Sequence, residues 1–120
     1  MDIYFKERRL QKACNSQQES LKTWGPEIAQ KLRQRLVELY AADCLSDISF
    51  LPPPRLHELS GNWEGCFAVD LRHPFRLVFK PLDPVPLNSD GGIDRDQVTS
   101  ILIIEVEDYH GKRKKRKFGK

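Results

Sequence analysis

The sequence has only three cysteines, a single methionine and no long hydrophobic run. No apolar stretch approaches the ~18 residues that a transmembrane helix requires, so nothing in the sequence indicates a membrane span. The residues from Met1 to Phe5 lack a basic segment followed by an apolar one, which argues against a secretory signal. The cysteines, Cys14, Cys44 and Cys66, form no CxxC pair and no disulfide framework. We therefore expect a cytoplasmic protein in which the thiols are small buried side chains.

Familiar catalytic signatures are absent as well. The sequence contains no glycine-rich phosphate loop, no HExxH or GxSxG motif and no cluster of metal ligands. The three histidines are isolated from one another in the chain. We therefore expect no metal and no other cofactor, and a Ser-His-Asp triad has no support.

Charge is distributed unevenly along the chain of 120 residues, which has the length of one domain. Residues 112–120 hold seven of the 20 lysines and arginines and no acid, so residues 1–111 carry 13 basic and 17 acidic side chains. A block of like charge cannot pack, and we predict a folded domain over 1–111 and a disordered tail over 112–120. The tail is either a solubilising segment, an import signal or an arm that binds nucleic acid, and we favour the arm. Its candidate RNA-binding residues are Lys112, Arg113, Lys114, Lys115 and Arg116.

The N-terminal half of the chain predicts a short strand followed by helices. Ile3 to Phe5 is prone to form a strand, and residues 7–13 a short helix. Ser16 has the spacing of an N-cap for the next helical stretch. Gly25 and Pro26 then end that stretch and begin a long helix over residues 26–42. Its apolar stripe consists of Ile28, Leu32, Leu36 and Leu39, and we expect Lys31, Arg33 and Arg35 to face solvent.

In the C-terminal half the apolar period changes to two, which predicts strands. We expect strands over 56–59, 66–71 and 75–80, the last two joined as a hairpin, and a central, almost wholly apolar strand over 98–106. Residues 81–97 are rich in proline, aspartate and glycine and predict an exposed loop. The fold class is therefore α+β, with a helical pair on one face of a curved, mostly antiparallel sheet.

Polar residues on these strands are the candidates for a site. Arg76 lies in the middle of the strand over 75–80, and Lys80 projects from the same face four residues later. The last strand leads into Asp108, Tyr109 and His110, so titratable groups lie at one rim of the sheet. Composition alone favours a plainer interpretation, in which Tyr109 covers the edge of the core and His110 is solvated.

Five segments carry a resemblance to a known family: 25–27, 56–61, 65–71, 73–79 and 107–111. In order and spacing they resemble the RelE/HigB type of killer toxins from bacterial toxin–antitoxin, or plasmid-maintenance, modules. The resemblance covers roughly residues 2–111 and implies the RelE/ParE-like α+β fold. It further implies cleavage of mRNA on the ribosome. The implied partner is a small helix-turn-helix antitoxin of the HigA kind, whose complex with the toxin binds operator DNA.

The resemblance implies a catalytic surface of Arg76, Tyr109, His110 and Asp108, with His57 and Lys80 as further contacts to RNA. Cleavage without a metal needs a cation against the developing phosphorane charge and two groups that move protons. Arg76 suits the first role, because a guanidinium binds phosphate oxygens bidentately. Tyr109 and His110 suit the second, Tyr109 could instead stack on a base, and Asp108 could orient His110.

Two other functions remain open at this point. A gyrase-poisoning toxin of the ParE type shares the fold and has no RNA-cleaving site. A non-enzymatic domain that binds RNA or a partner would also explain the basic tail. The acidic body departs from the basic character expected of ribosome-acting toxins, a departure that the tail could offset.

Overall fold

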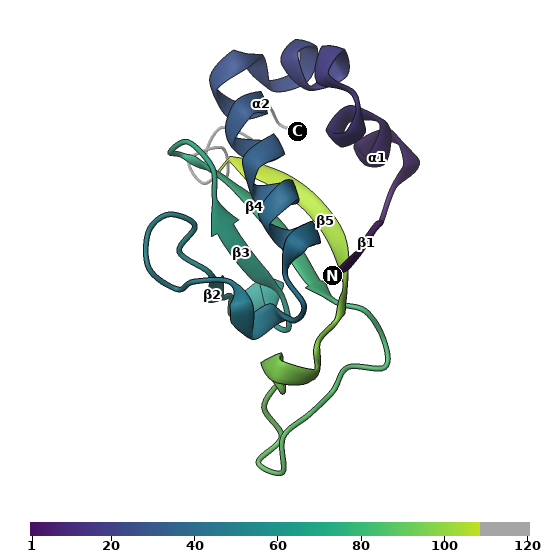
Figure 1. The fold of residues 1–120 in the computed structure, drawn as a ribbon, viewed down its shortest axis with the longest axis vertical. Helices are drawn as coiled ribbons and strands as arrows, with labels where there is room; N and C mark the ends of the chain where they lie inside the picture. The colour runs from purple at the N-terminus through teal and green to yellow at the C-terminus, as the bar shows by residue number, and fades with distance from the viewer. Residues whose placement is uncertain (109–120) are drawn as a thin grey trace.

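The computed structural model describes residues 1–108, which form a five-stranded sheet with two helices on one face (Figure 1). Its helices and strands are β1 (Asp2–Phe5), α1 (Arg8–Asn15), α2 (Gln17–Ala41), β2 (His57–Glu58), β3 (Phe67–Asp70), β4 (Phe75–Pro81) and β5 (Ser100–Asp108). The predicted α+β fold class is confirmed. Tyr109, His110 and the tail over 112–120 lie outside the described residues, so what we predict for them stays a prediction.

The helices begin and bend where the sequence predicts. The Ser16 hydroxyl accepts a hydrogen bond from the Glu19 backbone N–H at 3.2 Å and so caps the start of α2. Gly25 interrupts α2 with a φ of 84° and a ψ of 168°, a conformation that side chains with a Cβ rarely adopt. Pro26 follows directly and restarts the helix in a new direction.

The sheet has the strand order β1-β5-β4-β3-β2. β1 pairs with β5 in parallel, and the other neighbours are antiparallel. β5 therefore has a partner on both sides, which confirms the central position predicted from its apolar sequence. β3 and β4 form the predicted hairpin. The ladder between β4 and β5 shifts its register between Val78 and Phe79, which bends this part of the sheet.

The core lies between α2 and the face of the sheet that α2 covers, which we call the inner face. From the apolar stripe of α2, Ile28, Leu32 and Leu39 are buried and Leu36 packs against the core. Opposite them, Phe67 and Phe79 stack with ring centroids 6.2 Å apart. Their main neighbours on the inner face are Val69, Leu77, Ile101 and Ile103, each fully buried.

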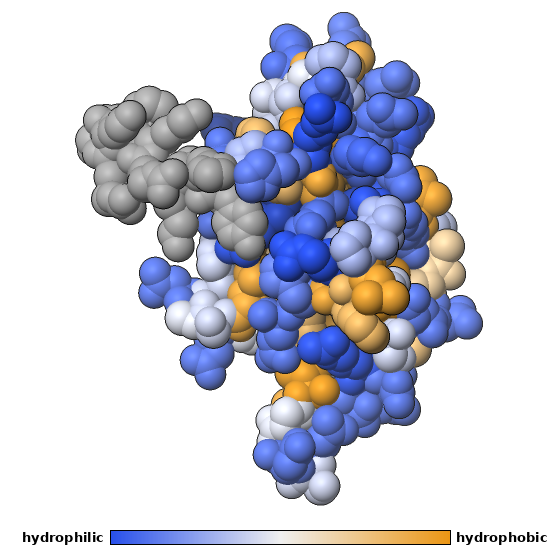
Figure 2. Space-filling model, turned by 90° about the vertical axis from the view of Figure 1, so that its left-hand side faces the viewer, coloured by the Kyte–Doolittle hydropathy of each residue, from blue (hydrophilic) through white to orange (hydrophobic). Residues whose placement is uncertain are grey.

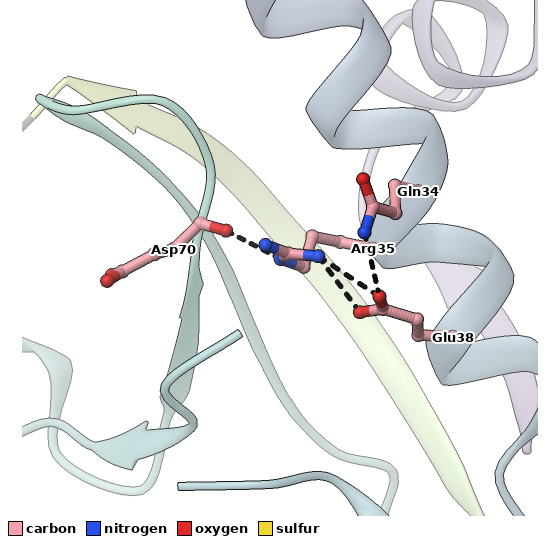
Figure 3. A network of polar contacts seen from close by, with 4 residues as sticks. All are labelled: Gln34, Arg35, Glu38 and Asp70. Carbon is pink, nitrogen blue, oxygen red and sulfur yellow. Dashed lines mark hydrogen bonds and ion pairs between the residues drawn. The ribbon is translucent and has the colours of Figure 1, made fainter. Parts of the chain in front are cut away.

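One prediction about α2 is wrong: Arg35 does not face solvent but is 2% exposed. Its Nε donates to the backbone oxygen of Asp70 at 2.8 Å, and its Nη1 lies 3.1 Å from both carboxylate oxygens of Glu38 (Figure 3). The physical reason is its position, since Arg35 follows Leu32 by three residues and falls within the apolar stripe. The buried guanidinium thereby ties α2 to the end of β3.

Hydrophilic residues cover most of the surface seen from the side of β2, with hydrophobic residues in separate patches (Figure 2). Phe50 and Leu51, in the connector between α2 and β2, are the most exposed large apolar side chains of that segment, at 71% and 59%. Within residues 1–108 no helix is long and apolar enough to cross a membrane.

Candidate functional site

The candidate site lies on the face of the sheet opposite the helices, which we call the outer face. Alternation along β4 places Arg76, Val78 and Lys80 on this face. The register then adds Glu107 beside Arg76, and Leu102 beside Lys80. Across the remaining strand pairs, the outer face includes Asp70 and Ala68 on β3, His57 on β2 and Tyr4 on β1.

Arg76 is held in a buried ion pair. Its Nε lies 2.6 Å from Oε1 of Glu107, its direct cross-strand neighbour, and the two side chains are 7% and 6% exposed. The indole Nε1 of Trp63 donates to the other carboxylate oxygen, Oε2, at 3.3 Å. A charge buried this far requires a hydrogen-bonded counter-charge, and Glu107 provides it. The guanidinium is therefore fixed in orientation, and its charge is locally balanced.

A second arginine, Arg55, lies next to this pair. Its Nε and Nη2 contact the two carboxylate oxygens of Asp70 at 2.6 and 2.9 Å, a bidentate geometry. Asp70 is also the cross-strand neighbour of Arg76. Arg55 has a φ of +57°, in the left-handed region that is costly for a residue with a side chain. Backbone strain therefore lies at Arg55, directly after the prolines at 52–54, and the side chain of the same residue pairs with Asp70.

His57 presents an unpaired ring nitrogen. Its Nδ1 lies 2.9 Å from the backbone oxygen of Arg55. A carbonyl oxygen can only accept, so Nδ1 carries a proton. Nε2 is buried and has no hydrogen-bond partner among the described residues. Because Nε2 is covered, it is not placed to take a proton from a bound substrate.

Lysines mark the other end of the outer face. Burial raises the pKa of the Cys66 thiol, while the ammonium groups of Lys80 and Lys6 act on it in the opposite direction. Lys80 follows Phe79, the cross-strand neighbour of Phe67, and so lies beside the start of β3. Within residues 1–108 neither lysine forms an ion pair with a carboxylate. The register also places the carboxylates of Asp2 and Glu105 on the outer face.

The predicted site residues are brought together in part. Arg76 and Lys80 share one face of β4, as the alternation predicts, and β5 lies beside β4 as a shared site requires. Asp108 is the cross-strand neighbour of Phe75, so it projects from the inner side of the sheet rather than beside Arg76. The joint catalytic role of Arg76 and Asp108 with Tyr109 and His110 stays a prediction.

Sequence reasoning missed Glu107, Trp63 and Arg55. For Glu107 the sequence offered part of a signal, because alternation along β5 decides which residues share its face. Its place opposite Arg76 depends on the register of β4 against β5. Trp63 and Arg55 had none, since they reach the site from irregular segments whose path depends on the whole fold. Within residues 1–108 no cluster of side chains is suited to hold a metal ion.

Comparison with known proteins connects this fold to toxin–antitoxin complexes. No protein-family model matches the chain, and no curated protein matches it in sequence. A chain of the YoeB–YefM complex from Staphylococcus aureus has a similar structure, with a TM-score of 0.53 at 13% identity over 89% of this chain and 94% of that one. A heterotetrameric YoeB–YefM toxin–antitoxin complex from the same bacterium gives 0.51 at 14% identity over the same shares. At these identities the likeness shows a shared fold and nothing finer.

Proposed function

We propose that this chain is the toxin of a bacterial toxin–antitoxin module and that it cuts mRNA on the ribosome without a metal. The observation that carries the proposal is the outer face, where the guanidinium of Arg76 is fixed in orientation. The strand β5, beside Arg76, leads directly to Tyr109 and His110. The fold shared with chains of toxin–antitoxin complexes supports the same conclusion.

The chemistry would proceed by attack of a ribose 2′-oxygen on the adjacent phosphorus. The 2′-hydroxyl gives its proton to a base, the new P–O bond forms, and the bond to the 5′-oxygen breaks as that oxygen takes a proton from an acid. The products are a 2′,3′-cyclic phosphate and a free 5′-hydroxyl. Arg76 would stabilise the charge that develops on the phosphate, because its orientation is fixed before substrate arrives.

The proton carriers are proposed from the chemistry of their side chains. Tyr109 and His110 are our candidates for the base and the acid, and Asp108 for the residue that orients His110. His57 remains a candidate contact to RNA, because its buried Nε2 does not reach a 2′-hydroxyl. Glu107 acts through Arg76 and is a positioning residue.

The partner would be a cognate antitoxin, of the small helix-turn-helix HigA kind, and operator DNA would be bound only through the pair. An apolar pocket of about 410 Å³ between β1, α1 and α2 supports a protein partner. Val37 and Tyr40, two of its lining residues, are 60% and 73% exposed. Exposed apolar side chains that gather at a groove mark interaction surfaces more often than isolated ones do.

The test is expression of the chain with and without the neighbouring antitoxin, followed by mapping of mRNA ends. We expect growth arrest without the antitoxin, cuts spaced by codons, and 2′,3′-cyclic phosphate ends. Arg76→Ala should lower the cleavage rate ~10²–10³-fold, as loss of one transition-state donor does elsewhere. Tyr109→Phe, His110→Gln and His57→Gln keep the shape and should reduce cleavage while the chain still binds its antitoxin.

Other outcomes would contradict the proposal. A DNA-damage response without mRNA cleavage would favour a gyrase-directed toxin of the ParE type. Absence of toxicity, together with retained RNA binding, would favour a non-enzymatic domain. Wild-type cleavage by both Arg76→Ala and Tyr109→Phe would remove these residues from the reaction.

The basic tail should contribute affinity and not chemistry, because none of its side chains suits proton transfer near neutral pH. Deleting residues 112–120 should weaken binding to RNA or ribosomes and flatten its dependence on salt. Cleavage at saturating protein should survive the deletion. Its loss at saturation would instead place the tail within the site.

A further inference from the structure

Tyr4 is an exposed aromatic residue on the same outer face, on the edge strand β1. Its side chain is 49% exposed. In the register of the sheet, Tyr4 lies beside Leu102, and Leu102 lies beside Lys80. The flanking residues Ile3 and Phe5 pack instead against the core on the other face. The ring therefore stands on a sheet surface next to a lysine, with solvent over it.

Two cations flank this ring. Lys80 is two strands away, a backbone separation of about 10 Å that its long side chain can shorten. Lys6 follows Tyr4 by two residues and continues the outer-face alternation of β1, since its N–H donates to the backbone oxygen of Ile103 at 2.9 Å. Asp2, two residues before Tyr4, lies on the same face of β1, so the ring has a carboxylate neighbour as well.

We propose that Tyr4, Lys6 and Lys80 form a subsite for single-stranded RNA, in which a base stacks on Tyr4 and the lysines bind the flanking phosphates. The inference rests on the proposed function, because it concerns the same face. Stacking on an aromatic side chain combined with basic residues along the backbone is how proteins bind single strands without reading their sequence. Unlike Arg76, neither lysine is engaged by a carboxylate within residues 1–108.

The subsite is separate from the proposed reaction centre. Lys80 and Arg76 are four residues apart on β4, which corresponds to ~13 Å along the strand. Because Glu107 holds the guanidinium of Arg76 in place, the two residues suit two successive phosphates better than a single one. A strand held at Arg76 would therefore place a neighbouring nucleotide, and not the one that is cut, at Tyr4.

The chain offers a control in Phe50. Phe50 is more exposed than Tyr4, at 71%, and lies in the connector between α2 and β2 rather than on a strand of the sheet. Its substitution removes an exposed aromatic ring and leaves Tyr4, Lys6 and Lys80 in place.

The experiment measures binding of a fluorescent oligouridylate to the purified full-length chain by anisotropy, as a function of salt. The probe carries 2′-O-methyl groups so that it cannot be cut. We expect Tyr4→Ala to weaken binding about 5- to 100-fold, the range that loss of one stacked base produces, and Tyr4→Phe to bind like the wild type. Lys6→Ala and Lys80→Ala should each lower the slope of log K against log salt by about 0.7. Phe50→Ala should change nothing.

Each other outcome overturns the inference. Wild-type binding by Tyr4→Ala, or an equal loss in Phe50→Ala, would exclude stacking at Tyr4. If the unmodified chain cuts mRNA while Tyr4→Ala binds and cuts equally well, the subsite alone is wrong. If the unmodified chain neither binds the probe nor cuts mRNA, the proposed function fails and the subsite fails with it.

Discussion

The two ends of the outer face differ in how their cationic side chains are paired. At one end Arg76 and Arg55 each contact a carboxylate, from Glu107 and Asp70. At the other end Lys80 and Lys6 contact none within residues 1–108. Arg76 lies in the interior of the sheet, on a strand with a neighbour on each side, where an unpaired charge would be costly. The lysines lie at the ends of their strands, where their ammonium groups reach water.

The contrast separates two tasks on one surface. A paired and buried arginine is fixed in orientation, which suits stabilisation of a single charge in a transition state. Because its own charge is balanced by Glu107, it contributes little to the long-range attraction of a polyanion. Lys80 and Lys6, which form no ion pair within residues 1–108, act in the opposite way. They raise the affinity and the association rate for a polyanion, but their flexible side chains do little to orient it. The acidic body of the chain is thus compatible with a local basic surface.

The largest expected effect is at the arginine end. Glu107→Ala should lower the free energy of unfolding by about 3–5 kcal/mol, because it removes the carboxylate that balances the buried guanidinium of Arg76. Urea denaturation measures the loss. The double variant Arg76→Met with Glu107→Leu should recover most of it, since an apolar pair of similar volume replaces the charges. A loss under ~1 kcal/mol for Glu107→Ala would mean that solvent reaches the pair.

A smaller effect is expected at Asp70. Asp70→Asn keeps the shape of the side chain and removes the charge that Arg55 contacts. Both side chains of this pair are about one third exposed, so solvent screens it, and we expect a loss of about 1 kcal/mol by urea denaturation. The bond from Arg35 should persist, because it uses the backbone oxygen of Asp70. A loss as large as that of Glu107→Ala would show that the two pairs act as one network.

The smallest effect on stability is expected at the lysine end. Lys80→Ala should change the free energy of unfolding by less than about 0.5 kcal/mol, because the residue holds no counter-charge in place. The same variant should nevertheless reduce the salt dependence of RNA binding. Equal effects on stability at Lys80 and Glu107 would erase the distinction between the two ends.

Much of the fold could be predicted from local pattern. The helix stripe of Ile28, Leu32 and Leu39, the break at Gly25 and the hairpin of β3 and β4 each depend on residues close together in the sequence. The candidate site was predictable only in outline. Arg76 was identifiable as a polar residue within a strand, but its partner lies 31 residues later in the chain.

The sequence by itself determined which segments form helices and strands and which of their faces are apolar, because both depend on period and on turn residues. Only the tertiary structure decided what the polar residues contact. The pairing of Arg76 with Glu107 required the register of β4 against β5, and the burial of Arg35 required α2 to lie against the end of β3. These contacts form when segments distant in the sequence meet, and a charge that becomes buried there is tolerated because a partner arrives from the other segment.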